Sequence, residues 1–166
     1  SAFYGCTGLT SVIIGGSNVG DTLTEIQETA FANCTSLKSL TIGDSVGTIG
    51  RYAFSNTGVE QVSLGKNITR MIYNAFENCD ALTSITLPES LIFFDEGIFR
   101  DCDSLKQITI PDSVTSIGRS AFDNCDSLES VTIGSGVTTI HLYAFQNCPS
   151  LTSIVIPENV KTIGLS

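Results

Sequence analysis

Six cysteines recur along the chain and are the first residues to consider for chemistry. They are Cys6, Cys34, Cys79, Cys102, Cys125 and Cys148. Cysteines form disulfides or bind zinc, but zinc sites commonly contain C-x-x-C pairs, and this sequence has none. The last four follow one another at intervals of 23 residues. This spacing predicts that they occupy equivalent positions in a structural repeat.

Acidic residues directly follow three of these cysteines, at Asp80, Asp103 and Asp126. Their spacing predicts that they stack along one edge of the molecule, with Asp101 and Asp123 nearby. Such a cluster of oxygens can bind Ca²⁺ or attract a basic partner. Alternatively, each Asp caps its own backbone in an exposed turn. Calcium-binding loop signatures are absent, and the sequence leaves these alternatives open.

No catalytic motif accompanies His141, which is the only histidine. The sequence has no Ser-His-Asp ordering, no glycine-rich phosphate loop and no H-E-x-x-H motif. The net charge of −9 provides no basic face for nucleic acid or for an anionic membrane surface. No apolar run approaches the roughly 18 residues of a membrane span. We therefore expect no enzyme activity, no cofactor, no metal, no nucleic-acid partner and no membrane insertion of this segment.

A repeat of 22–23 residues must position all these side chains. It is marked by Phe3, Phe31, Phe54, Phe76, Phe99, Phe122 and Phe145. Each unit also contains two apolar residues separated by one position and followed by Gly or Pro, which is the pattern of a short strand that ends in a turn. Such pairs include Leu40/Ile42, Val62/Leu64, Ile85/Leu87, Ile108/Ile110, Val131/Ile133 and Ile154/Ile156. A lone unit cannot bury its apolar face, so the repeat predicts a stacked solenoid.

Stacking also constrains the cysteines. Coils about 4.8 Å apart keep neighbouring Cβ atoms beyond the roughly 3.5–4.5 Å of a disulfide, and a straight row cannot give tetrahedral coordination. We predict a ladder of buried free thiols that act as small hydrophobic side chains. An asparagine column at Asn33, Asn56, Asn78, Asn124 and Asn147 predicts a structural role in a turn, although Asn33 and Asn67 also begin glycosylation sequons.

This repeat resembles the BspA-like leucine-rich repeats, also called the treponemal class. Their signature, C-x-x-L-x-x-I-x-[IL]-P-x-[SV]-V-x-x-I-G-x-x-A-F, is matched almost completely by CDSLKQITIPDSVTSIGRSAFDN, from Cys102 to Asn124. The resemblance covers the whole chain. It implies a right-handed parallel β solenoid, mainly β with very short helices, of about seven coils. It also implies a cell-surface or secreted protein used for adhesion or recognition.

Two places along the chain break the period of the repeat. Residues 1–166 are expected to form one domain, and because neither end carries a polar cap, a fragment of a longer array. Five extra residues within GGSNVGDT, between Ile14 and Ile26, predict a loop that either carries binding residues or is a tolerated insertion. The third unit is one residue short after Asn56, and Thr57 replaces its cysteine.

Apolar and aromatic residues interrupt otherwise polar or glycine columns in the middle units. Ile92 and Phe93 stand where other units have Thr or Ser, and Ile72 stands where several have Gly. Tyr52 and Tyr73 fall nearby on adjacent coils. Exposed patches of this kind usually mark an interface. We predict that these five residues form a contact site; the alternative is local repacking with the side chains turned inward.

The outward positions of the first strands form neutral rows, for which peptide or glycan binding and simple solubility are equally good explanations. They are Ile13, Thr41, Ser63, Thr86, Thr109, Thr132 and Val155, beside Ser11, Ser39, Gln61, Ser84, Gln107, Ser130 and Ser153. The sequence therefore favours a recognition or adhesion module that binds a protein or glycan at the cell surface. The alternative is a structural spacer that projects another domain. Irregular residues concentrated in the middle units favour the binder.

Overall fold

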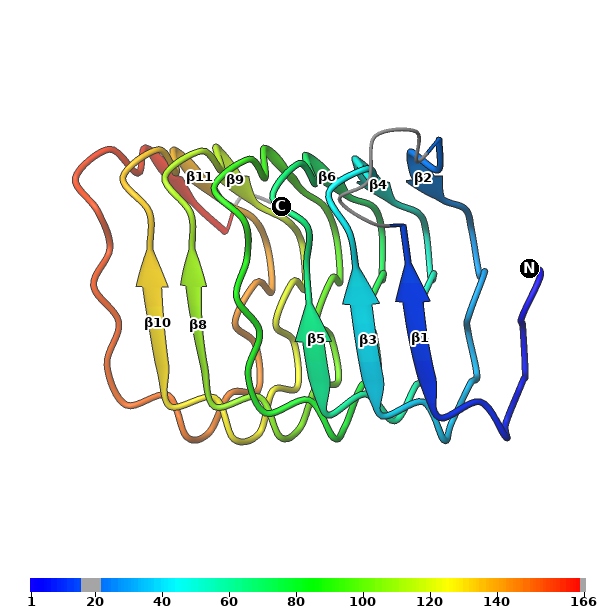
Figure 1. Cartoon of the computed structure of the whole chain (residues 1–166). Helices are drawn as coiled ribbons and strands as arrows, with labels where there is room; N and C mark the ends of the chain where they lie inside the picture. Colours follow the sequence, from blue (N-terminus) through cyan, green and yellow to red (C-terminus); the bar gives the residue numbers. More distant parts are fainter. Residues whose placement is uncertain (16–21, 165–166) are drawn as a thin grey trace.

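The computed structural model describes residues 1–15 and 22–164 and forms a parallel β solenoid. In Figure 1 the chain rises on the near face, crosses the top and returns behind as it advances, which is a right-handed coil. The predicted fold is confirmed with a slightly different coil count, because Phe3 to Phe145 enclose about six turns. Within the described residues, no helix is long and apolar enough to cross a membrane.

The prediction of very short helices is wrong, since the described residues contain turns and no helix. Two residues in each turn adopt a positive φ, as Tyr52 (53°) and Asn56 (55°) do, which ends any right-handed helical run. The amide of Phe54 lies between them and donates to Ala75 of the next coil instead of to its own turn. The hydrogen bonds that a helix would need are therefore used between coils.

The first strand of the units forms one side of the solenoid (Figure 1). It comprises β1 (Ser11–Ile14), β3 (Ser39–Ile42), β5 (Gln61–Ser63), β8 (Gln107–Ile110) and β10 (Ser130–Ile133). The strands pair in parallel in the orders β1-β3-β5 and β10-β8. In β3, β8 and β10 apolar residues point inward and polar residues outward, as the alternation predicts.

The second strand of the units is shorter and forms another side. Its members are β2 (Glu25–Ile26), β4 (Thr48–Ile49), β6 (Arg70–Met71), β7 (Phe93–Phe94), β9 (Ser116–Ile117), β11 (Thr139–Ile140) and β12 (Thr162–Ile163). They pair in the orders β2-β4-β6-β7 and β12-β11-β9. The amide of Gly118 donates to the Phe94 carbonyl (3.1 Å), so the two groups are joined across β7 and β9.

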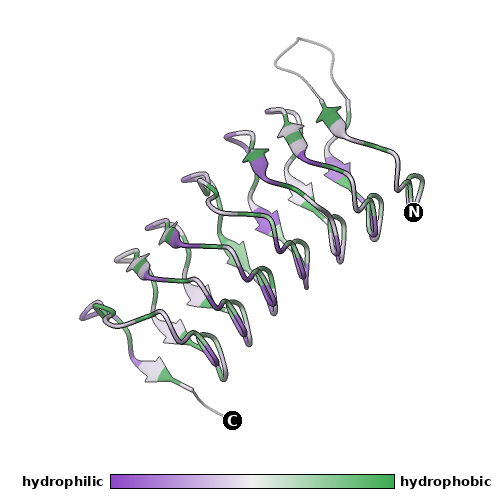
Figure 2. Cartoon of the chain, turned by 90° about the horizontal axis from the view of Figure 1, so that it is seen from below, coloured by the Kyte–Doolittle hydropathy of each residue, from purple (hydrophilic) through white to green (hydrophobic). Residues whose placement is uncertain are grey.

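A continuous stack of phenylalanine rings runs through the core. Neighbouring rings from Phe3 to Phe145 have centroids 5.0–5.8 Å apart and lie nearly parallel. The stack is fully buried in its middle members, Phe54, Phe76, Phe99 and Phe122. Figure 2 shows the coils one behind another, so each apolar face is covered by its neighbours.

Turn residues and thiols form ordered columns beside this stack. Every predicted asparagine has a positive φ, which confirms the turn role of the column: Asn33, Asn56, Asn78, Asn124 and Asn147. The cysteines are free. Burial of the ladder is confirmed for the four inner thiols but wrong for Cys6, which is exposed, and for Cys148, which is partly exposed. These two thiols lie toward the ends of the stack.

The thiols are hydrogen-bond donors as well as small apolar groups. Each Sγ from Cys34 onward donates to the phenylalanine carbonyl of the preceding coil at 3.1–3.3 Å. Burial raises the pKa of the Cys125 thiol, which keeps it protonated and able to donate. In the short third unit the Thr57 hydroxyl donates instead to Phe54 of its own coil (2.8 Å).

The first-strand sheet is interrupted in the middle of the solenoid. The predicted strand at Ile85/Leu87 is wrong: this segment makes one bridge, Ser84 to Gln107, and no strand. Among the described residues, no backbone hydrogen bond joins residues 60–64 to residues 83–87, an interval that we call the seam. The Ile154/Ile156 pair is also not in a strand.

The seam lies directly after the third unit, which is one residue short. A Cβ atom on Gly58 would overlap the Thr35 carbonyl oxygen, so the shortened turn lies directly against the second unit. Its strand β5 pairs with β3 of the second unit, with Val62 opposite Leu40. The fourth unit has the full-length turn, and in the described part of the chain its strand segment makes no backbone hydrogen bond to β5.

Candidate recognition face

Three of the five predicted contact residues have exposed side chains on the second-strand side. Phe93 is 49% exposed, Ile92 43% and Tyr73 40%. In β7 the neighbouring Phe94 points inward and is 2% exposed, because successive residues of a strand alternate in direction. The inward-packed alternative is therefore wrong for Phe93, Ile92 and Tyr73. Tyr52 and Ile72 are half-buried.

Each exposed ring in this region supports an arginine from the preceding coil. The guanidinium of Arg70 lies 4.8 Å from the ring centroid of Phe93, and that of Arg51 lies 5.0 Å from Tyr73. Cations over ring faces at this distance are attracted by the ring quadrupole. We call these four residues, with Ile92, the arginine–aromatic face.

The backbone brings the predicted residues together in two neighbouring groups. The amide of Tyr52 donates to the Tyr73 carbonyl (3.0 Å), so the two tyrosines lie on paired coils. Together with Arg51, Asn74 and Glu96, they line a shallow hollow of about 250 Å³. The amides of Ile92 and Phe93 both donate to Thr69, at 3.0 and 3.1 Å. Ile72 directly follows β6 and donates to Ile49 (3.0 Å).

Three of the eight basic side chains have acidic partners within residues 1–15 and 22–164. Lys38, Lys66 and Arg100 each have a carboxylate within 4 Å: Glu60, Asp44, and the pair Glu77 and Asp101.

Within the part of the chain that the structure describes, Arg51 and Arg70 have no such partner and lie over rings instead. The ring occupies one face of the guanidinium and leaves its N–H edges for other contacts. Burial raises the pKa of the nearby Asp95 carboxyl, while Arg70 opposes this shift. The face therefore carries both signs of charge.

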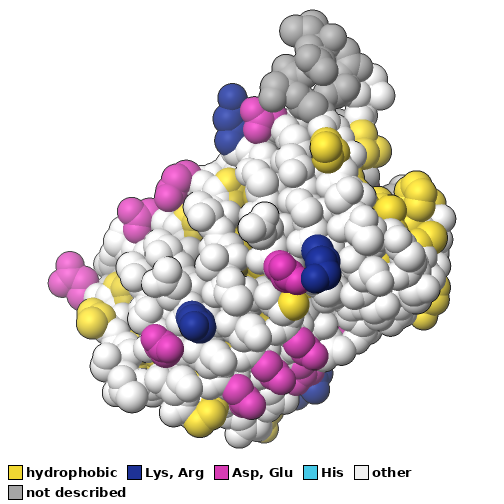
Figure 3. Space-filling view, turned by 60° about the horizontal axis from the view of Figure 1, so that its bottom comes forward, with side chains coloured by type: hydrophobic (Ala, Val, Ile, Leu, Met, Phe, Trp, Pro, Cys, Tyr) yellow, Lys and Arg dark blue, Asp and Glu magenta, His cyan; other side chains and the backbone are white. Residues whose placement is uncertain are grey.

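Acidic side chains gather along one edge of the molecule, as Figure 3 shows on a face that is otherwise mostly neutral. Burial and the neighbouring Asp80, Asp126 and Asp101 carboxylates raise the pKa of Asp103. Within residues 1–15 and 22–164, no group of three or more His, Cys, Asp or Glu side chains is placed to hold a metal ion. A basic partner remains compatible with this edge.

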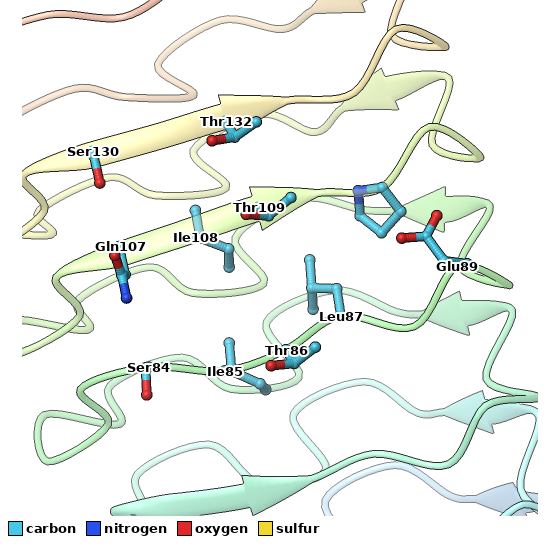
Figure 4. Close-up of a pocket in the computed structure, with 11 residues that line it drawn as sticks. Ser84, Ile85, Thr86, Leu87, Glu89, Gln107, Ile108, Thr109, Ser130 and Thr132 are labelled. Carbon is cyan, nitrogen blue, oxygen red and sulfur yellow. The ribbon is translucent and has the colours of Figure 1, made fainter.

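The neutral rows predicted on the first strands are exposed along the whole first-strand side. Figure 4 shows Ser84 and Thr86, Gln107 and Thr109, and Ser130 and Thr132 around a hollow beside the segment 84–87. The loop predicted within GGSNVGDT falls mostly on residues 16–21, which lie outside the described residues.

Sequence reasoning missed the arginines that lie over the rings. A third pair, Arg119 over Tyr143 (5.5 Å), has the same arrangement farther along the solenoid. In each pair the arginine precedes the aromatic residue by one turn, at 22, 23 or 24 residues. A search for charged and aromatic residues one repeat apart would have found all three.

Comparison with known proteins gives one family and several similar structures. A family model described as a BspA type leucine rich repeat region matches six copies, over residues 1–125 and 71–166. No curated protein sequence matches the chain.

The T. pallidum leucine-rich repeat protein is similar, with a TM-score of 0.88 and 30% identity over 94% of this chain and 73% of that one. A leucine rich cell surface protein from Faecalibacterium prausnitzii has a TM-score of 0.82 and 31% identity, over 93% of this chain and 43% of that one. A Bacteroides ovatus leucine-rich repeat protein has a TM-score of 0.72 and 26% identity, over 94% and 47%. The chain thus spans less than half of the last two proteins.

Proposed function

The chain belongs to the BspA-type leucine-rich repeat family, and from this premise we propose that it is a recognition or adhesion module of a cell-surface or secreted protein. It binds a protein or glycan partner through the arginine–aromatic face. Its rigid solenoid holds the contact residues in place, and the irregular residues of that face supply the specificity. The similar F. prausnitzii protein is described as a leucine rich cell surface protein, which supports the proposed location.

The pairing of exposed rings with arginines that have no carboxylate partner among the described residues carries this proposal. Aromatic residues and arginine dominate the energetics of protein interfaces. Side chains already held in one geometry lose less entropy on binding. Here the Phe93 and Tyr73 rings support Arg70 and Arg51 before any partner arrives. The monotonous Thr and Ser rows on the first strands offer no comparable cluster.

Substitution of Phe93 by Asp tests whether the arginine–aromatic face binds the partner. The folded chain is first applied to an array of extracellular-matrix proteins and glycans, and each binding partner is then titrated. Because the substitution removes a ring and its support of Arg70, we expect at least a tenfold loss of affinity, as for an interface hot spot at about 2 kcal/mol. Val155→Asp, at a position 81% exposed on the first-strand side, is the control and should bind normally.

Two results would contradict this proposal. Equal affinity of the Phe93→Asp variant for an identified partner would remove the arginine–aromatic face from the binding site. Absence of any partner for a correctly folded chain would instead favour the structural spacer. That alternative is supported by the uninterrupted phenylalanine stack, which makes the solenoid a stiff rod.

A further inference from the structure

The seam between the third and fourth units has the features of a second binding site, on a different side of the solenoid from the arginine–aromatic face. We propose that it binds an extended peptide segment of a partner protein, which adds a strand between β5 and residues 83–87. This inference does not depend on the function proposed above, because it uses a separate sheet and different residues.

Backbone groups on both sides of the seam point into it. The amide of Gln61 donates to Lys38 (3.2 Å), so Gln61 and Ser63 face β3, and the alternate residues Val62 and Leu64 face the seam. On the other side, the Thr83 carbonyl accepts from Lys106 (3.1 Å).

Because Thr83 faces β8, the alternate residues Ser84 and Thr86 face the seam. Within the described residues, none of these facing groups of Val62, Leu64, Ser84 and Thr86 has a backbone partner across it. Two strand edges with unpaired donors and acceptors thus face each other, and such edges pair readily with another chain.

The seam is also hollow. Residues from both edges, including Gln61, Val62, Ser84 and Thr86, line a depression of about 590 Å³. A second depression continues along the same line between Leu64 and Ser90. The two follow the strand direction, in which four to six extended residues span roughly 13–20 Å. Beyond the segment 84–87 lies the third hollow, shown in Figure 4.

The lining favours a peptide over a sugar. No aromatic residue lines these three hollows in the described structure, so a sugar ring finds no stacking surface. Two of the charged groups beside the seam are paired, Glu60 with Lys38 (2.9 Å) and Lys66 with Asp44 (3.3 Å), whereas Glu89 has no ion pair among the described residues. Strand addition takes its affinity from main-chain hydrogen bonds and its selectivity from alternate side chains. The chemistry therefore fits an extended segment with alternating apolar and polar residues.

A peptide that copies a strand of this chain is the direct probe. The acetylated and amidated peptide KSLTIGD, residues 38–44, has the side-chain alternation that the solenoid already accepts. In the free protein we expect fast amide hydrogen exchange at Val62 and Thr86 relative to Thr132. The peptide should bind saturably and slow exchange at both seam positions. The same peptide N-methylated at alternate residues should bind at least tenfold more weakly, because it lacks the donors.

Two substitutions at the exposed Thr86 separate the contribution of its backbone amide to peptide binding from that of its side chain. Thr86→Pro removes an amide that faces the seam, so peptide affinity should fall at least tenfold. Thr86→Val keeps the amide and removes the hydroxyl, so affinity should stay within about twofold.

Slow exchange at Val62 and Thr86 in the free protein, or equal binding of the N-methylated peptide, would overturn the proposal. Both tests use the unaltered protein and so hold even if a variant fails to fold. Protection of the seam by cellohexaose, weakened by Thr86→Val, would assign it to a glycan and also overturn the proposal. Neither result involves Phe93, so this proposal and the previous one fail separately.

Discussion

Two parts of the first-strand sheet have nearly the same strand sequence but different pairing. The segments SITL, from Ser84, and QITI, from Gln107, share the alternation of polar and apolar residues. Yet β8 pairs with β10 over four residues, from Ser130 opposite Gln107 to Ile133 opposite Ile110, whereas the segment 84–87 makes one bridge. The strand residues alone therefore do not decide whether a ladder forms.

The solenoid tolerates the seam because the other sides of the same coils remain joined. The Phe54 and Phe76 rings stack at 5.3 Å, and Asn78 donates to Asn56 in the turn column. On the second-strand side, β4, β6 and β7 pair without interruption. The opening is thus confined to one side of the coil, where it leaves strand edges free without separating the core.

Substitutions that leave a cavity, one in the β8–β10 ladder and one at the seam, should have the largest effects on stability. Ile110→Ala lies within the β8–β10 ladder and should lower the free energy of unfolding by about 4 kcal/mol. Leu87→Ala, at the seam, should cost about 2 kcal/mol, because a wall without a ladder can relax into the cavity. Both side chains are buried, at 1% and 5% exposure. Urea unfolding of both variants measures the difference, and equal costs would show that the seam is as rigid as the ladder.

Proline substitutions compare the backbone directly. Ser130 donates its amide to Lys106, and Thr132, two residues on, therefore points its amide at β8. Thr132→Pro removes this ladder bond and should cost about 2 kcal/mol. Thr86→Pro removes an amide with no partner in the described residues and should change stability by less than about 0.5 kcal/mol. Thermal unfolding of the pair checks this, and a large loss for Thr86→Pro would mean that its amide is already bonded.

Sequence periodicity predicted the features that every unit repeats. The phenylalanine stack, the inner thiols and the asparagine turns depend on identical neighbours one coil away, so a column of residues is enough to infer them. The seam depends on how the backbones of two neighbouring coils lie relative to each other, and no residue type marks that arrangement.

In the sequence, Tyr73 and Phe93, the rings under Arg51 and Arg70, stand out only as single departures from the repeat. Their pairing becomes evident once side chains one turn apart are compared. The short helices were expected from family resemblance, and they are absent from the described residues because amides such as that of Phe54 bond to the next coil.

The acidic edge allows a further comparison between a regular position, Asp103, and a position beside the seam, Asp80. The expected effect on stability is the smallest of those predicted. Asp103 stands between Asp80 and Asp126, whereas Asp80 has Gly58 in place of one acidic neighbour, because the short turn of the third unit carries no carboxylate there. The pKa of Asp103 is raised by burial and by its acidic neighbours, so its ionised form is disfavoured in the folded state. A group of this kind contributes stability below its unfolded pKa and loses that contribution as the pH rises through the higher folded pKa.

Asp103→Asn should therefore raise Tm at pH 7 by about 1 °C in low salt, a small effect because the side chain is exposed. The difference from the unaltered chain should vanish at about pH 3, where the carboxyl is protonated in both states, and shrink in 1 M salt. Asp80→Asn, beside the seam, should raise Tm less, because it removes only one of the three carboxylates that repel Asp103. Scanning calorimetry at the two pH values measures both variants. A larger gain for Asp80→Asn would mean that the carboxylates on the seam side lie closer together than the regular column allows.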